Sequence, residues 1–193
     1  YETVRKFGGK AVMTSERHEN GTSRIIEVIG NECYKEYDFI INIQGDEPLI
    51  DVDSINLIAD SYRKEKSEIV TLKKELMIKE EIENPNIVKV ITDFNDNAVY
   101  FSRSVIPYNR ENRTGFKYFK HIGIYGYTAD FLKKLGSLRD GVLEKIESLE
   151  QLRFIENGYS IKVLETTSSV IGVDTPEDLE AVRKYVRENN IAL

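Results

Sequence analysis

The stretch Phe39-Ile40-Ile41-Asn42-Ile43-Gln44-Gly45-Asp46-Glu47-Pro48 decides the fold of this chain. Its first six residues form a nearly continuous apolar, β-branched run, which is typical of a strand buried on both faces of a parallel sheet. Gly45 then permits a tight exit or the close approach of a ligand, and Pro48 stiffens the loop. We therefore expect a buried strand that ends in a loop with two carboxylates at the edge of a sheet.

Outward from this strand, predicted helices and strands alternate. Hydrophobic spacing and capping residues predict helices at 23–29, 53–66, 79–83, 129–135, 142–156 and 176–188, with Asp51 or Asp53 capping the second and Thr128 capping the fourth. Strands are predicted at 10–14, 39–44, 69–73, 121–127 and 161–165, and two more at 88–92 and 98–102 form a hairpin. This order predicts an α/β three-layer sandwich with a mostly parallel sheet and one antiparallel insertion.

One domain, 1–193, is expected, because no repeat, low-complexity tract or linker divides the chain. Its first residues have the pattern of the end of a helix, with Tyr1, Val4 and Phe7 at helical spacing before Gly8-Gly9. Since proteins seldom begin inside a helix, we expect this domain to be N-terminally incomplete, with at least one strand missing.

Composition excludes several classes of protein. The net charge of −6 and the pI near 5.2 are the wrong sign for a nucleic-acid binder, although a small anionic substrate stays possible. No run approaches the roughly 18 apolar residues of a membrane span, and the first residues do not resemble a signal peptide. The single cysteine, Cys33, rules out an internal disulfide and fits a reducing compartment. We therefore expect a cytoplasmic protein that binds neither nucleic acid nor membrane.

Asp46 is one of two aspartates predicted to follow strands at the ligand-binding edge of the sheet. The other, Asp174, lies in Ile171-Gly172-Val173-Asp174-Thr175-Pro176-Glu177-Asp178, one residue before Thr175, which begins a helix. The alternative for the first loop is a turn whose acids cap the next helix. Because Mg²⁺ typically takes one or two carboxylates together with phosphate oxygens, the two aspartates predict magnesium and a nucleotide.

The segment from His18 to Arg24 is a loop that opens a helix. Backbone N–H groups at such a start favour an anion or carbonyl ligand, and Arg24 lies one turn inside. The alternative is an ordinary helix start, capped by Asn20 or Thr22.

Three further segments carry polar side chains where a ligand is one explanation. His121, Tyr125 and Tyr127 are an even number of residues apart, so they share one face of a strand, with glycines between them that leave room for something to approach. The alternative is an aromatic face that packs on a partner chain. Ser102-Arg103 ends a hairpin strand, and Glu150-Gln151 lies in an apolar helix where polar groups need partners. Routine salt bridges are the alternative for both.

Taken together, these motifs resemble those of CMP-Kdo synthetases (Kdo is 3-deoxy-manno-octulosonate). The matching segments stand in that family's order and extend over the whole chain: Gln44-Gly45-Asp46-Glu47-Pro48, Asn84-Pro85-Asn86 with Val88-Lys89-Val90, Tyr100-Phe101-Ser102-Arg103, His121-Ile122-Gly123-Ile124-Tyr125-Gly126-Tyr127, Leu149-Glu150-Gln151-Leu152-Arg153, and Gly172-Val173-Asp174-Thr175-Pro176-Glu177-Asp178. Each motif is weak alone, but six in order are highly specific.

The resemblance implies a glycosyltransferase-A-like fold, a homodimer, and Mg²⁺-dependent transfer of CMP from CTP to Kdo for lipopolysaccharide synthesis. It implies that Asp46 and Asp174 bind the metal and are catalytic. Thr22 and Arg24 would hold the nucleotide, with Gln44 assigned to both the nucleotide and the sugar pocket. The implied sugar-binding residues are Arg103, His121, Tyr125, Glu150 and Gln151.

One departure from the family pattern stands out. The family opens with a strand and a basic glycine-containing loop around the triphosphate, and this sequence contains neither. Two other readings stay open: a CMP-sialic acid synthetase, which shares fold and chemistry, and a catalytically inactive dimerising fragment. The motifs 121–127 and 149–153 favour Kdo over sialic acid.

Overall fold

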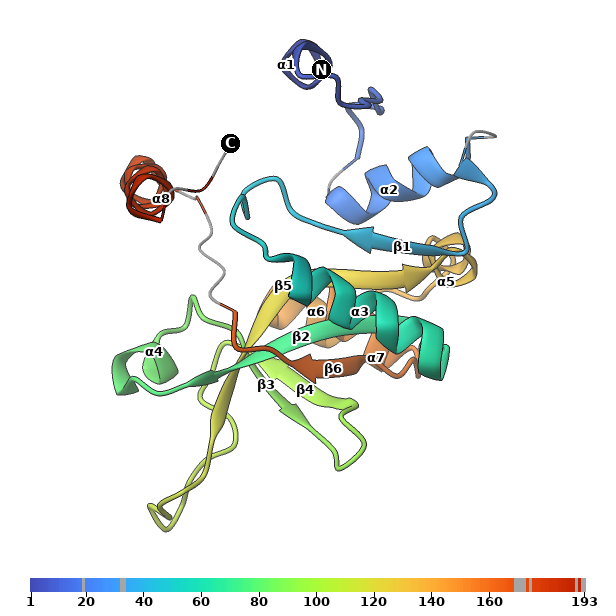
Figure 1. Ribbon diagram of the computed structural model, residues 1–193. Helices are drawn as coiled ribbons and strands as arrows, with labels where there is room; N and C mark the ends of the chain where they lie inside the picture. Colours follow the sequence, from blue (N-terminus) through green and yellow to red (C-terminus); the bar gives the residue numbers. More distant parts are fainter. Residues whose placement is uncertain (19, 32–33, 169–172, 174, 190, 192–193) are drawn as a thin grey trace.

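A mixed six-stranded sheet forms the centre of the molecule (Figure 1). The computed structural model describes residues 1–193 except 19, 32–33, 169–172, 174, 190 and 192–193. The strands are β1 (Phe39–Asn42), β2 (Ile69–Leu76), β3 (Lys89–Thr92), β4 (Ala98–Ser102), β5 (Tyr118–Thr128) and β6 (Lys162–Glu165). Their order is β4-β3-β5-β2-β6, and β1 pairs with the remaining edge of β5.

The long strand β5 determines how the sheet is paired. It is antiparallel to β1, β2 and β3, whereas β2 and β6 are parallel. Four strands therefore point one way and β4 and β5 the other, but among the described strands only β2 and β6 are parallel neighbours. The expected α/β fold is confirmed, with a sheet more antiparallel in its pairing than the sequence predicted. The reason is that β5, a reversed strand, inserts between β1 and β2, and an apolar run does not reveal its direction.

Helices cover both faces of the sheet and give the three layers. Helix α3 (Val52–Glu65) lies on one face and packs through Ile58 against Val70, Leu72 and Ile124. On the other face lie α5 (Ala129–Leu135), α6 (Val142–Glu147) and α7 (Gln151–Glu156) (Figure 1). Their apolar side chains form the larger core cluster with residues of β2, β3, β4, β5 and β6.

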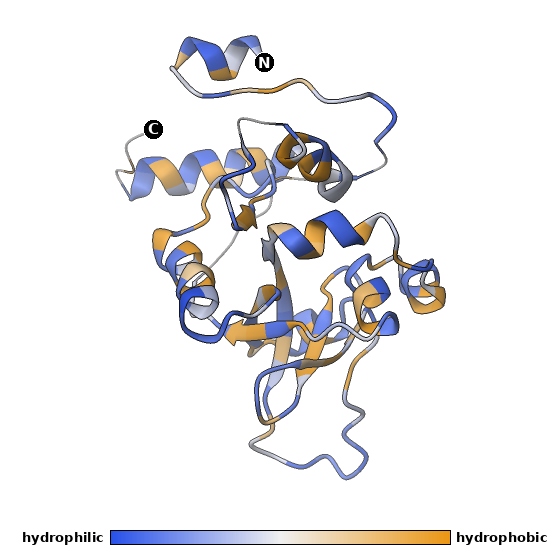
Figure 2. Cartoon of the chain, turned by 90° about the vertical axis from the view of Figure 1, so that its right-hand side faces the viewer, coloured by the Kyte–Doolittle hydropathy of each residue, from blue (hydrophilic) through white to orange (hydrophobic). Residues whose placement is uncertain are grey.

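The remaining helices lie around this sandwich. They are α1 (Glu2–Lys6), α2 (Gly21–Ile29), α4 (Lys79–Glu83) and α8 (Pro176–Glu188). Helix α2 lies beside β1, whereas α1 buries none of its residues and stands apart from the sheet in both views (Figures 1 and 2). No helix in the described ranges is both long enough and apolar enough to cross a membrane.

Capping residues set several helix starts as the sequence predicted. The Asp51 side chain, rather than that of Asp53, accepts from the backbone N–H of Ser54 and begins α3. Thr128 begins α5 in the same way, and Thr175 forms a reciprocal capping box with Asp178 at α8. Each cap satisfies a backbone donor that would lack a partner inside the helix.

Two predicted elements are wrong. Residues 10–14 form no strand. Their polar contact is with Arg24 of α2 instead, whose Nη1 donates to Thr14 Oγ1 at 2.7 Å. The single helix predicted at 142–156 is two helices, α6 and α7, because Ser148 has a left-handed backbone with a φ of 55°. This break turns residues 149–151 toward the sheet.

Candidate active site

A cavity of about 250 Å³ opens between β1, β5, the start of α2 and the α6–α7 turn. We call it the site cavity. Six of the ten residues predicted from the sequence line it: Thr22, Gln44, His121, Tyr125, Glu150 and Gln151. The other lining residues are Asn42, Gly123, Tyr127, Leu149 and Phe154. Side chains from four separate segments therefore meet at one place.

A bulge in β5 shapes the floor of the cavity. Thr71 of β2 pairs with Tyr125, but the next residue, Leu72, pairs with Ile122, so two residues of β5 bulge out of the ladder. One of them is Gly123, where an added Cβ would lie 3.5 Å from Glu47 Oε1. The loop after β1 therefore packs close to Gly123. The other glycine of the motif, Gly126, lies under core side chains instead.

His121, Tyr125 and Tyr127 share one face of β5, as their spacing predicted. The Tyr125 and Tyr127 rings stack with centroids 5.4 Å apart, and the His121 ring lies 5.3 Å from that of Tyr125. Tyr127 also packs against Phe154 of α7. Because the two tyrosines are only 6% and 2% exposed, they line the interior of this chain and are not a half-exposed surface for a partner.

The hydroxyl of Tyr125 is buried near the Thr71 hydroxyl, but no hydrogen bond of ordinary geometry reaches it among the residues that the structure describes. Burial raises the pKa of Tyr125 well above its ordinary value of 10, so the group stays a neutral phenol. An unpaired buried hydroxyl costs about 1–3 kcal/mol, and folded proteins rarely leave one without a reason. A polar ligand in the cavity would supply the missing partner.

Glu150 connects the α6–α7 turn to the start of α2. Its carboxylate accepts from Thr22 Oγ1 at 2.7 Å and from Asn20 Nδ2 at 3.1 Å. Burial raises the pKa of Glu150 above its ordinary value, and the hydrogen bond from Thr22 opposes that shift. Glu150 therefore has hydrogen-bond partners in the protein and also lines the cavity, so a ligand-binding role for residues 150–151 stays a prediction.

The loop after β1 brings the two aspartate motifs together. The backbone N–H of Val173 donates to the carbonyl of Asp46 at 2.8 Å, and Asp46 itself is exposed. Asp174, the next residue after Val173, lies outside the described residues. Beside Asp46, the Glu47 Oε2 atom is buried without a partner within the described part of the chain. Burial raises the pKa of Glu47, and the neighbouring Asp46 charge raises it further.

Two predicted residues, Arg24 and Arg103, do not line the cavity. Arg24 Nη1 donates to Thr14 Oγ1 and to the Ser15 carbonyl. Arg103 donates from Nε to the Glu147 carbonyl at 2.9 Å and from Nη1 to the Pro85 carbonyl at 3.3 Å. Both guanidinium groups therefore have protein partners here.

Sequence reasoning assigned no role to Asn42, Phe154 or Thr71, which the fold brings to the cavity or directly behind it. Asn42 gave a signal, because it is a polar residue inside an apolar strand. Phe154 and Thr71 gave none, because an apolar helix position and a strand threonine are common in any core.

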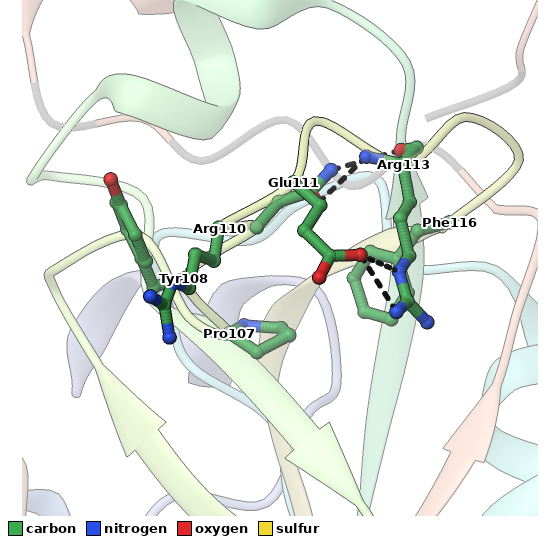
Figure 3. Close-up of a pocket in the computed structure, with 7 residues that line it drawn as sticks. Pro107, Tyr108, Arg110, Glu111, Arg113 and Phe116 are labelled. Atoms are coloured by element: carbon green, nitrogen blue, oxygen red, sulfur yellow. Dashed lines mark hydrogen bonds and ion pairs between the residues drawn. The ribbon is translucent and has the colours of Figure 1, made fainter.

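A separate hollow of about 300 Å³ lies in the segment between β4 and β5. Figure 3 shows its lining, with Arg113 bonded through Nε and Nη2 to Glu111 and Tyr108 pointing away from that pair. All its lining residues come from 107–116 of one exposed segment, and none was predicted as a site residue. The chemistry is therefore assigned to the site cavity.

Comparison with known proteins places the chain in a family. Residues 1–163 match the model of a cytidylyltransferase family, so the chain belongs to the cytidylyltransferases. A 3-deoxy-manno-octulosonate cytidylyltransferase of Fusobacterium nucleatum subsp. nucleatum is 58% identical over 100% of this chain and 78% of the relative. One of Syntrophus aciditrophicus is 46% identical over 95% of this chain and 74% of the relative. Within the cytidylyltransferases, the chain is a member of this group, and the resemblance to CMP-Kdo synthetases is confirmed.

A solved structure gives the same result. A CMP:2-keto-3-deoxy-manno-octonic acid synthetase complexed with CTP is 40% identical and has a TM-score of 0.90. The match covers 97% of this chain and 76% of that chain. The fold predicted from the resemblance is thus confirmed.

Proposed function

We propose that this protein transfers CMP from CTP to Kdo, releases pyrophosphate, and so supplies CMP-Kdo for lipopolysaccharide synthesis. One observation carries the proposal. This chain belongs to the family, and four separate segments of it place their predicted polar side chains around one cavity beside the Asp46 loop. In the reaction, the anomeric hydroxyl of Kdo attacks the α-phosphate of CTP and pyrophosphate leaves. Positioning and charge neutralisation dominate such transfers.

Polar groups of the cavity are suited to reading sugar hydroxyls. The unpaired Tyr125 hydroxyl offers a donor and an acceptor, and the Glu150 carboxylate, already held by two donors, offers further lone pairs. The buried side chain of Gln151 and the exposed one of Gln44 add amide groups at the two sides. We propose that Kdo binds here, with Thr22, Arg24 and Gln44 toward the nucleotide.

The Asp46 loop fits a magnesium ion. Its side chains are carboxylates, which hard cations prefer, and a cation near Asp46 would also favour the ionised form of Glu47, whose pKa is raised by burial and by the Asp46 charge. We propose that Asp46 and Asp174 hold Mg²⁺. When bound, the ion would neutralise phosphate charge and draw two anionic reactants together.

Arg103 is proposed to meet the carboxylate of Kdo, on the strength of the family resemblance. Its contacts with the Glu147 and Pro85 carbonyls orient the guanidinium without neutralising it. A guanidinium that keeps its charge suits a carboxylate ligand.

We also propose that the protein acts as a homodimer in the cytoplasm. Large apolar side chains stand exposed on the segments that extend from the β2–β5 ladder, among them Met77 at 88% and Tyr108 at 85%. A second copy of the chain would remove such exposed apolar side chains from water. Light scattering in solution tests the dimer, and a monomeric mass for the active protein contradicts it.

The function is tested by pyrophosphate release from CTP and Mg²⁺ with Kdo or sialic acid, using the protein expressed from its complete reading frame. We expect pyrophosphate release with Kdo and none with sialic acid. We also expect this release to be lost in Asp46→Asn and after chelation of Mg²⁺. Asp53→Asn is the matched control, because this acid lies on α3 outside the cavity lining. Release with sialic acid instead would overturn the assigned sugar. Full activity of Asp46→Asn would overturn the metal site.

A further inference from the structure

Thr71 lies directly behind the site cavity and is completely buried. Its Oγ1 is 3.0 Å from His121 Nε2, 3.1 Å from the Ile122 carbonyl oxygen and 2.8 Å from the Ile124 carbonyl oxygen. The two carbonyls converge on one hydroxyl because β5 bulges opposite Thr71. One side chain of β2 thus contacts both the backbone of the bulge and a ring that lines the cavity.

The number of protons in this cluster decides its arrangement. A threonine hydroxyl has one proton to donate, and a carbonyl oxygen can only accept. If that proton pointed to His121, two carbonyl oxygens would face the Thr71 oxygen with no hydrogen between them, which is repulsive. The proton therefore points to a carbonyl of the bulge, and the hydroxyl oxygen accepts from His121 Nε2–H.

The other ring nitrogen, Nδ1, has no hydrogen-bond partner in the described part of the chain, and the ring lines the cavity. Burial lowers the pKa of His121 to about 3, so the imidazole is neutral at ordinary pH and has only one N–H. With Nε2 protonated, Nδ1 keeps its lone pair. Toward the cavity, His121 is then an acceptor of hydrogen bonds.

We propose that Thr71 is a positioning residue that fixes His121 as the Nε2–H tautomer, so that Nδ1 accepts a hydrogen bond from a hydroxyl of the bound substrate. The part of this inference that concerns substrate rests on the proposed function, whereas the tautomer does not. The ligand class is a polyhydroxylated acid with a hydroxyl donor facing His121. A substrate group that can only accept hydrogen bonds is disfavoured at that position, because its lone pair would face the lone pair of His121 Nδ1.

The tautomer is measured by long-range proton–nitrogen NMR of the imidazole rings in the purified protein. The chain has only two histidines, so His18→Gln identifies the signals of His121. We expect an unprotonated Nδ1 and a protonated Nε2 in the natural protein and in Thr71→Ser, which keeps the hydroxyl. In Thr71→Val, which loses it, we expect a shift toward the Nδ1–H form. A protonated Nδ1 in the natural protein, or an unchanged tautomer in Thr71→Val, overturns the proposal.

Kinetics supply the second measurement. In Thr71→Val, the hydrogen bond between His121 Nδ1 and the substrate hydroxyl should be lost, so kcat/KM for Kdo should fall about tenfold. The KM for CTP should be unchanged in this variant. Thr71→Ser should have kinetic constants close to those of the natural protein. An equal loss for both substrates would indicate general damage and overturn the positioning role. If Kdo is no substrate at all, the NMR result still decides the Thr71–His121 relation, and only the proposed function fails. If Thr71→Val does not fold, the natural protein and Thr71→Ser alone decide the tautomer.

Discussion

Lowering the pH should destabilise this protein through His121. Its ring lies edge-on to Phe101 at 5.1 Å and beside Tyr125 at 5.3 Å. Burial among these groups lowers the pKa of His121 from 6.5 to about 3. The imidazole therefore stays neutral in the folded protein at pH values where an unfolded chain binds a proton on it.

The sign of the effect follows from this difference in proton binding. Below pH 6.5 the unfolded state is protonated at His121 and the folded state is not, so the free energy of unfolding falls as the pH decreases toward 3. The slope is about 1.4 kcal/mol per pH unit well inside this window. Between pH 7 and pH 5, the unfolded state gains about 2 kcal/mol of protonation free energy from this residue.

Urea unfolding of the natural protein and of His121→Gln at pH 7, 6 and 5 measures this contribution. Other groups titrate in both proteins, so their effects cancel in the comparison. We expect the natural protein to lose about 2 kcal/mol more than the variant from pH 7 to pH 5. His18→Gln is the control, because it keeps the buried ring and should show the full loss. Equal losses in the natural protein and His121→Gln would refute the reasoning.

Three further predictions concern other parts of the fold. Lys89→Met should lower the free energy of unfolding, measured in urea, by about 3 kcal/mol. The buried ammonium donates to the carbonyls of Asn84, Ile87 and Arg103, and the methionine side chain offers no donor in its place. An unchanged urea midpoint of unfolding would contradict this prediction. Gly126→Ala should lower the free energy of unfolding by about 1–3 kcal/mol, since the new Cβ would meet Phe39 at 2.4 Å and Ile58 at 2.5 Å. Gly136→Ala, whose Cβ would meet nothing within 4 Å, should leave the stability unchanged or raise it slightly. Similar losses of stability in the two variants would argue against the packing described. Thr22→Val removes the hydrogen bond that opposes the raised pKa of Glu150, so the acid limb of the pH profile of kcat/KM for Kdo should move to higher pH, and a stationary limb would show that Glu150 need not be ionised.

Features that depend on residues close in sequence were predicted correctly, whereas features that depend on distant residues were not. Thr128 and Thr175 were predicted as helix caps and are caps, since a cap depends on a hydroxyl and a backbone N–H only three residues apart. The helix predicted at 142–156 is wrong because the left-handed residue Ser148 gives no local warning. Its break is held by contacts from elsewhere, including the hydrogen bonds of Glu147 with Ser102 and Arg103.

The site shows the same division. Spacing alone placed His121, Tyr125 and Tyr127 on one face, because side chains alternate along any strand. Spacing did not show that Thr22 would reach Glu150 from 128 residues away, nor that Thr71 would lie behind His121. The metal-binding roles of Asp46 and Asp174 stay predictions, although the Val173–Asp46 hydrogen bond brings their two motifs together.

By itself, the sequence determined the alternation of helices and strands, the helix caps, the shared face of the 121–127 motif and the family to which the chain belongs. These depend on neighbouring residues, or on motifs whose order survives in one dimension. Only the tertiary structure decided that β5 inserts between β1 and β2, that its bulge aims two carbonyls at Thr71, and that Tyr125 is left with an unpaired hydroxyl. Each of these depends on which strand edges meet, and that choice is made by the packing of the whole core rather than by any segment within it.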